Sequence, residues 1–431
     1  MTKSLIPRHL FEQNRKELVQ KLKNKSVAIV NSNDEMPRNG DQFFQYRQHS
    51  DMYYLTGIEQ EKTILLLCPE HPLPKNREIL FIIRPNPTME TWFGKKLTKT
   101  EATELSGVEN ILYVDEFTPV LDEASSLCDN IYLNLNENPR FKPDVETRDV
   151  RFAADMKQKF PLHNYERLAP LITELRLIKK PEEITIMRHA CDITGKAFNR
   201  ILKYVIPGVY EFEVEAEITH EFIKNGARGH AYAPIVASGE NACVLHYIEN
   251  RKICNDGEIL LLDFGAEFSN YAADCSRSIP VNGKFTLRQM QLYNATLRVF
   301  KKAKALMVKG ASITIINKQV GKLWEEEHVK LGLYSLEDLK HQDPDVPLYT
   351  KYFMHGIGHF LGLDVHDTGS RYQTLEPGMV LTCEPGIYVR EENVGVRLEN
   401  NILITEGEPI DLMQNIPIEA EEIEDLMNKK K

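Results

Sequence analysis

Residues 352–367, YFMHGIGHFLGLDVHD, constrain the fold of this chain more than any other stretch. They place three histidines, His355, His359 and His366, among three glycines. Glycine lets the backbone turn sharply and approach other groups closely, so these imidazoles are expected on backbone that can come close to a ligand. A single histidine in a loop is usually solvated or hydrogen-bonded, but three within twelve residues indicate a shared role.

Four acidic residues stand in or beside apolar, strand-like segments elsewhere in the chain. Asp263 and Asp274 flank a predicted turn, where an antiparallel hairpin can bring both carboxylates to one face, and Glu384 and Glu399 lie in two later segments. Buried carboxylates are costly unless they are paired or bound to metal. With one imidazole, these acids form an oxygen-rich set that suits two divalent cations better than one tetrahedral zinc. Each acid alone is weak evidence, and the combination predicts a metal site.

Length and charge limit the class of protein. A chain of 431 residues exceeds what one hydrophobic core supports, so two domains are expected. The hydrophobic fraction of 42% and charged fraction of 27% are typical of soluble proteins. The net charge of −10 and the lack of an arginine-rich stripe argue against nucleic acid as a partner.

The N-terminal sequence and the cysteines predict a cytoplasmic location. The first twenty residues lack the apolar core of a signal peptide, and no apolar run is long enough for a membrane span. The seven cysteines are an odd number and form no C-x-x-C pair. We therefore expect reduced thiols and neither a disulfide framework nor a thiolate metal site.

Residues 1–172 are predicted to form an α/β domain. A helix is expected over residues 8–23, and apolar runs bounded by Pro, Asn or Gly predict strands over residues 26–31, 63–68, 78–84 and 130–135. Trp92, in ETWFGKKL, lies among Gly and Lys and outside any apolar run, so it is expected at a surface or interface.

Residues 173–431 are predicted to form an α+β domain with antiparallel strands. Helices are expected from residue 181 and over 211–224, 287–309 and 312–331, and strands over 231–238, 258–263, 271–280, 379–384, 395–399 and 401–405. The charged end, residues 419–431, is expected to be mobile.

The motifs present disfavour three other classes of site. His220-Glu221 lacks the second histidine of the zincin pattern, because residue 224 is Lys. The glycines of residues 356–362 do not have the spacing of a dinucleotide-binding loop, and no G-x-S-x-G nucleophile elbow occurs.

The motifs HGIGHFLGLDVHD, LDFGAEFSNYAADCSRSIPV, TCEPGIY and GVRLEN together resemble the metallopeptidase family that includes aminopeptidase P, prolidase and methionine aminopeptidase. The resemblance covers the second half of the chain and implies the pita-bread catalytic fold. RQHSDMYYLTG, ETWFGKKL and VASGENACVLHYIEN extend it to the first half and are most similar to the aminopeptidase P branch.

The resemblance implies a role for each candidate residue. It makes Asp263 a ligand of one metal, makes His359 and Glu384 ligands of the other, and lets Asp274 and Glu399 bridge the two, with Mn²⁺ as the expected ion. Glu384 would also carry the proton from the nucleophilic water to the leaving nitrogen. The remaining candidates that it implies are His355 and His366 as donors to the oxyanion and His246 near the substrate, and Trp92 is expected to reach toward an active site. Arg397 is expected either to orient Asp274 or another carboxylate from behind the ligands or to be a surface charge.

The substrate expectation also rests on the resemblance. It implies hydrolysis of the N-terminal Xaa-Pro bond of peptides by a metal-bridging hydroxide, in a homodimer or homotetramer whose first domain limits substrate length. Two alternatives stay open. A prolidase shares most catalytic motifs but cleaves Xaa-Pro dipeptides, and a non-catalytic member would bind peptides without cleaving them.

Overall fold

The computed structural model describes residues 6–429, which divide into two compact units. The first ends at Arg176 and the second begins at Leu177. The domain boundary expected between residues 172 and 173 stays a prediction.

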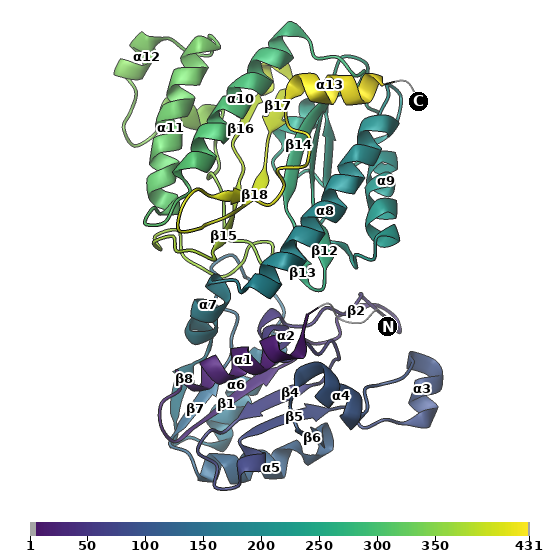
Figure 1. The fold of residues 1–431 in the computed structure, drawn as a ribbon, viewed down its shortest axis with the longest axis vertical. Coiled ribbons are helices and arrows are strands. Elements are labelled where there is room, and N and C mark those ends of the chain that lie inside the picture. The colour runs from purple at the N-terminus through teal and green to yellow at the C-terminus, as the bar shows by residue number, and fades with distance from the viewer. Residues whose placement is uncertain (1–5, 430–431) are drawn as a thin grey trace. The chain divides into compact units, whose positions relative to one another are not determined.

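The first unit is built on one six-stranded sheet with the order β6-β5-β4-β1-β7-β8 (Figure 1). Its strands are β1 (Ser26–Asn31), β4 (Ile64–Leu67), β5 (Glu78–Ile82), β6 (Asn110–Tyr113), β7 (Asn130–Leu133) and β8 (Asn164–Arg167). The central β1 pairs antiparallel with β4 and parallel with β7. A short hairpin, β2 (Pro37–Asn39) and β3 (Gln42–Phe43), lies outside this sheet.

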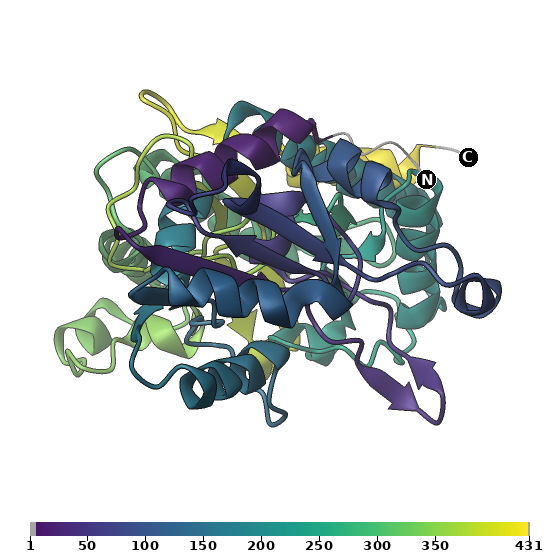
Figure 2. The ribbon, with the colours of Figure 1, turned by 90° about the horizontal axis from the view of Figure 1, so that it is seen from below.

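Helices cover both faces of this sheet. The helices of the first unit are α1 (Arg8–Val19), α2 (Ser50–Thr56), α3 (Pro87–Phe93), α4 (Lys99–Ser106), α5 (Phe117–Ser126), α6 (Arg148–Lys159) and, at its end, α7 (Ala169–Leu177). Alternate strand residues such as Val27 and Ile29 pack with α5 and α6 in one apolar core. Figure 2 shows α1, in purple, on the opposite face. The α/β prediction is confirmed.

The second unit consists of antiparallel sheets flanked by helices. Its strands are β9 (Gly229–His230), β10 (Ile235–Ser238), β11 (Ile259–Phe264), β12 (Ala266–Phe268), β13 (Tyr271–Ala272), β14 (Cys275–Pro280), β15 (Val380–Cys383), β16 (Gly386–Val389), β17 (Val394–Arg397), β18 (Asn400–Leu403) and β19 (Ile410–Asp411). Every strand pair described in this unit is antiparallel. The α+β prediction is therefore confirmed, and the architecture is the pita-bread fold.

Two helix pairs pack against these sheets (Figure 1). They are α8 (Pro181–Tyr204) with α9 (Glu211–Lys224), and α10 (Leu287–Leu306) with α11 (Ile313–Lys330), followed by the short α12 (Leu336–Lys340). The start of α8 has proline at its first position and Glu183 accepting from the backbone of Lys180, so local sequence sets where this helix begins.

Some sequence expectations differ from the structure. The strand expected over residues 271–280 is interrupted between β13 and β14, and Asp274 lies in the gap. The expectation of a mobile C-terminal end is wrong for α13 (Ala420–Asn428), whose Ala420 and Ile423 are buried. Although α13 carries many charged residues, its apolar residues recur at helical spacing and form one buried face. Residues 430–431 of that segment lie outside the described residues.

Two further predictions concern the chain as a whole. All seven cysteines are buried and free, so the prediction of free thiols is confirmed. Among residues 6–429, the helices are too short or too polar to cross a membrane.

Candidate metal centre

Two acidic residues of the centre come from neighbouring strands: Asp263 lies in β11, and Asp274 directly precedes β14. These strands pair antiparallel with Asp263 opposite Ser276, and the small β12–β13 hairpin extends the connection. At Gly265 any side chain would overlap the backbone carbonyl of Ala273. The close approach of the two strands therefore requires glycine here, and it brings Asp274 beside Asp263.

The glycine-rich segment is joined to β15 and to Glu384, which directly follows that strand. The backbone N–H of Thr382 donates to the carbonyl of His359 at 2.9 Å, and that of Glu384 donates to Ile357 at 2.9 Å. Gly358 lies between these two hydrogen bonds, with no room for a Cβ against the Thr382 carbonyl. The two backbones can touch only because residue 358 is glycine, and their contact brings His359 to Glu384.

Glu399 completes the group. Its backbone N–H donates to the carbonyl of Ser276 at 3.0 Å, and its carboxylate accepts from the Ser276 hydroxyl at 2.7 Å. Because Ser276 pairs with Asp263, these contacts bring Glu399 into the same site.

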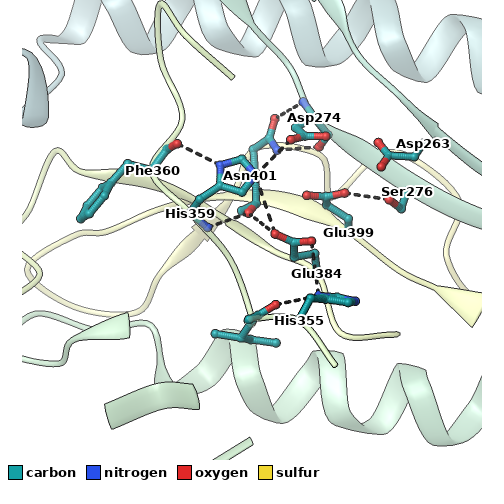
Figure 3. A network of polar contacts seen from close by, with 12 residues as sticks. Asp263, Asp274, Ser276, His355, His359, Phe360, Glu384, Glu399 and Asn401 are labelled. Atoms are coloured by element: carbon teal, nitrogen blue, oxygen red, sulfur yellow. Dashed lines mark hydrogen bonds and ion pairs between the residues drawn. The ribbon is translucent and has the colours of Figure 1, made fainter. Parts of the chain in front are cut away.

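The five predicted ligand side chains meet around one small space (Figure 3). One ligand atom from each of Asp274, His359 and Glu399 lies within 4.8 Å of the others. The Nε2 atom of His359 is 3.4 Å from Asp274 Oδ2 and 3.7 Å from Glu384 Oε1. Asp263 joins the same network through Tyr232, whose hydroxyl contacts both Asp263 and Asp274.

Two tyrosines and an arginine hold this network and extend it. The Tyr232 hydroxyl is 2.6 Å from Asp263 Oδ1 and 2.5 Å from Asp274 Oδ1. The buried Arg397 guanidinium donates to Asp263 Oδ2 at 2.7 Å and to the Tyr388 hydroxyl at 2.8 Å. Arg397 therefore orients a carboxylate of the centre, as one of the two expectations stated. That carboxylate is Asp263 rather than Asp274, and the buried Arg397 is not a surface charge.

Tyr232, Tyr388 and Asn401 were not identified from the sequence. Asn401 fixes the backbone of Asp274 by donating from Nδ2 to its carbonyl at 2.6 Å and accepting from its N–H at 3.2 Å. Tyr388 stands inside the motif TCEPGIY, which was a usable signal. Tyr232 has no comparable signal, because an aromatic residue near a strand resembles an ordinary core residue.

The electrostatics of the centre are those of crowded acids, of which Asp274 and Glu399 are buried and Asp263 and Glu384 are half-buried. Burial raises the pKa of Glu384 to about 7, with His359 opposing the shift and Asp274 adding to it. Burial and the charges of Asp274 and Glu384 raise the pKa of Glu399 well above its usual range. Burial disfavours charge on His359, but hydrogen bonding to Asp274 and the charge of Glu384 raise its pKa.

This donor set fits divalent cations. Burial raises the pKa of Asp263 even though the Arg397 guanidinium opposes the shift, so the acids resist being ionised together. A divalent cation among them would remove much of that cost. Carboxylate oxygens with one imidazole are ligands that such cations accept.

The remaining candidate histidines surround the ligands. Burial lowers the pKa of His355 to about 3, with the charges of Arg397 and His246 adding to the effect. The Nε2 atom of His355 lies 2.8 Å from the Tyr388 hydroxyl, and its Nδ1 atom lies 3.8 Å from Glu384 Oε2. The rings of His359 and His366 pack edge to face with centroids 4.3 Å apart.

Two candidates lie in exposed positions. His246 is exposed and follows the short helix Gly239–Cys243. Trp92, on α3 of the first unit, is 78% exposed, as expected of a surface residue. Its role at an active site stays a prediction.

Comparison with known proteins supports this description. The family model for metallopeptidase family M24 matches residues 185–406, and the model for the aminopeptidase P N-terminal domain matches residues 11–132. The Xaa-Pro aminopeptidase of Escherichia coli K12 is 36% identical, with 98% of each chain covered.

Solved structures of aminopeptidase P are similar to this chain over nearly its whole length. Aminopeptidase P from E. coli with the inhibitor Pro-Leu has a TM-score of 0.86 and 34% identity, covering 97% of this chain and 98% of that one. A zinc-substituted form of E. coli aminopeptidase P in complex with product has a TM-score of 0.87 and 35% identity, covering 98% and 99%. The chain therefore belongs to metallopeptidase family M24 and carries the N-terminal domain of aminopeptidase P.

Proposed function

We propose that this protein is a metal-dependent Xaa-Pro aminopeptidase, which removes the first residue of peptides that have proline in second position. The convergence of Asp274, His359 and Glu399 on one space carries the proposal, with Glu384 beside His359 and Asp263 sharing the Tyr232 hydroxyl with Asp274. Relatives that match nearly the whole chain are named Xaa-Pro aminopeptidase, which favours this activity over the prolidase alternative.

The five ligands would hold two divalent ions, with Mn²⁺ as the proposed metal. Asp263 would bind one ion, His359 and Glu384 the other, and Asp274 and Glu399 both. Two divalent ions would balance the four negative charges of the carboxylates. A ligand set with many oxygens and one imidazole suits Mn²⁺. Bound ions of this kind activate a water as the nucleophile and polarise the substrate carbonyl.

The protein groups around the ligands would perform the proton transfers. Glu384 would take a proton from the attacking water and return it to the proline nitrogen as the peptide bond breaks. Its Oε2 atom lies 3.8 Å from His355 Nδ1, which would help to orient it. His355 and His366 would donate to the developing oxyanion, and His246 would lie beside the substrate.

Arg397 and Tyr232 would keep Asp263 in place. Each of its two oxygens accepts one of their hydrogen bonds, so its position depends little on side-chain rotation. This arrangement supports a preformed site that loses little order when substrate binds.

The cellular setting belongs to the same proposal. Seven free, buried thiols suit a reducing cytoplasm. We also propose a homodimer or homotetramer in which the exposed Trp92 reaches a neighbouring active site; an unchanged activity of Trp92→Ala on every peptide length would contradict that role.

The test is amino-acid release from an Xaa-Pro-Yaa tripeptide and from an Xaa-Pro dipeptide, using metal-stripped protein before and after Mn²⁺ is added. Release from the tripeptide that depends on metal is the expected result. Cleavage of the dipeptide alone would identify a prolidase, and cleavage of neither by metal-loaded protein would identify a peptide-binding protein.

A further inference from the structure

Glu211 is a fully buried carboxylate outside the candidate metal centre. It is the first residue of α9 and has 0% of its surface exposed. A charge buried in this way is costly unless hydrogen bonds replace the lost water. In this case five donors replace it, and none of them is a charged group.

The donors divide between the two carboxylate oxygens. Oε1 accepts from the Ser238 N–H at 2.8 Å, the Ser238 hydroxyl at 2.9 Å and the Asn241 amide at 3.3 Å. Oε2 accepts from the Tyr247 hydroxyl at 2.7 Å and the Lys252 N–H at 2.9 Å. All four residues belong to one stretch, residues 238–252, which we call the His246 segment because His246 lies within it.

The contacts tie the His246 segment at its beginning, middle and end. Ser238 and Asn241 precede His246, Tyr247 follows it directly, and Lys252 ends the segment. Lys252 makes two hydrogen bonds with Glu211, because the Glu211 N–H also donates to the Lys252 carbonyl at 2.9 Å. An exposed turn that carries a candidate active-site residue is thus anchored to a rigid helix.

The same segment packs against the metal centre. Tyr247 and Leu245 pack on a small apolar cluster that includes Ala242 and Tyr388. The Tyr388 hydroxyl in turn lies 2.8 Å from His355 Nε2. A shift of the His246 segment would therefore move His246 relative to the groups that surround the ligands.

We propose that Glu211 is a positioning residue of the peptidase reaction, acting through Tyr247 to hold His246 at the substrate. The inference rests on the proposed function in one respect, since it takes His246 to act on substrate. Glutamate is required because both oxygens must accept. Glutamine would present an NH₂ group to one set of donors, and the Lys252 N–H cannot reverse its direction.

The test is a double-mutant cycle between Tyr247→Phe and His246→Ala, measured as kcat/KM on an Xaa-Pro-Yaa tripeptide. Tyr247→Phe removes one hydroxyl and leaves the ring in place. We expect it to lower kcat/KM about 10-fold, the equivalent of one hydrogen bond to a charged group. In the His246→Ala background the same change should cost less than about 2-fold, because its effect passes through His246.

A matched control and a second readout separate positioning from general loss of structure. Tyr293→Phe removes another hydroxyl of this unit, which donates to the Ile418 carbonyl at 2.8 Å, and should leave kcat/KM unchanged. Hydrogen exchange by mass spectrometry should show faster exchange, by about 10-fold, in peptides covering residues 244–252 of Tyr247→Phe and of Glu211→Gln. Metal content should stay at the wild-type value in all variants.

Three results would overturn the inference. They are an equal loss from Tyr247→Phe in both backgrounds, unchanged exchange of residues 244–252, and an unchanged kcat/KM in His246→Ala. A wild-type protein without tripeptidase activity would instead refute the proposed function. The exchange measurement would still decide whether Glu211 holds the segment, even if Glu211→Gln alone proved too unstable to isolate.

Discussion

Replacing Gly358 with alanine should separate the two backbones that bring His359 to Glu384. A Cβ at this position would lie well under 3.0 Å from the Thr382 carbonyl oxygen, whose backbone is fixed by the hydrogen bonds on either side. Carbon and oxygen atoms in close contact stay about 3.3 Å apart or more, so the segments must part by about 1 Å.

The magnitude follows from that displacement. Forcing a methyl group into a packed site costs about 1–3 kcal/mol of folding stability. A misplacement of about 1 Å at a catalytic group costs roughly 100-fold in rate. We therefore expect kcat/KM of Gly358→Ala on an Xaa-Pro-Yaa tripeptide to fall about 100-fold, with weaker metal binding and a Tm lower by roughly 5 °C.

Gly356→Ala is the matched control. It adds the same methyl group two residues away, where the nearest atom is Asn317 Nδ2 at 3.6 Å, an ordinary contact. Its kcat/KM should stay within about 2-fold of the wild type. Wild-type activity and metal content in Gly358→Ala, or an equal loss in both variants, would refute the reasoning.

Three other perturbations have defined outcomes. Arg397→Met removes the cation that is 2.7 Å from Asp263 Oδ2 in a buried site, so stability should fall by about 3–5 kcal/mol in chemical denaturation; an unchanged midpoint would contradict the pairing. Burial lowers the pKa of His328 to about 3, although Glu327 opposes this, so the unfolded chain takes up the proton first as pH falls below the ordinary value of 6.5. The free energy of unfolding therefore falls as the pH drops from 6.5 toward 3, and protonation of His328 in the unfolded chain accounts for about 2 kcal/mol of that fall by pH 5. Urea unfolding at pH 7 and pH 5 should show a smaller fall in His328→Phe than in the wild type. Finally, a thiol reagent should react with none of the seven buried cysteines in the native protein and with all seven after denaturation; a fast-reacting native thiol would show an accessible site.

The main features of the centre could be predicted because they follow from local rules. Acids in apolar strands must find partners, and glycines next to histidines indicate backbone that is closely approached. The structure gives the second rule a specific cause at Gly358, which touches the backbone of Thr382. The roles of the individual ligands stay predictions.

Two supporting residues, Glu211 and Tyr232, could not be predicted for a physical reason. Glu211 at a helix start looks like any acid placed to favour the helix dipole, and only the fold brings the residues from Ser238 to Lys252 to it. Tyr232 contacts Asp263 and Asp274, which lie 31 and 42 residues away along the sequence. Periodicity describes neighbours along one element, whereas these contacts depend on tertiary structure.

The most direct test of the metal centre is to measure bound metal and tripeptide cleavage together while Mn²⁺ is added back to stripped protein. We predict two equivalents bound per chain and cleavage that rises as they bind. Asp274→Asn and Glu399→Gln, which alter the proposed bridging ligands, should lose metal and activity together. Full cleavage by metal-free protein, or wild-type metal content in both variants, would contradict a centre built from these carboxylates.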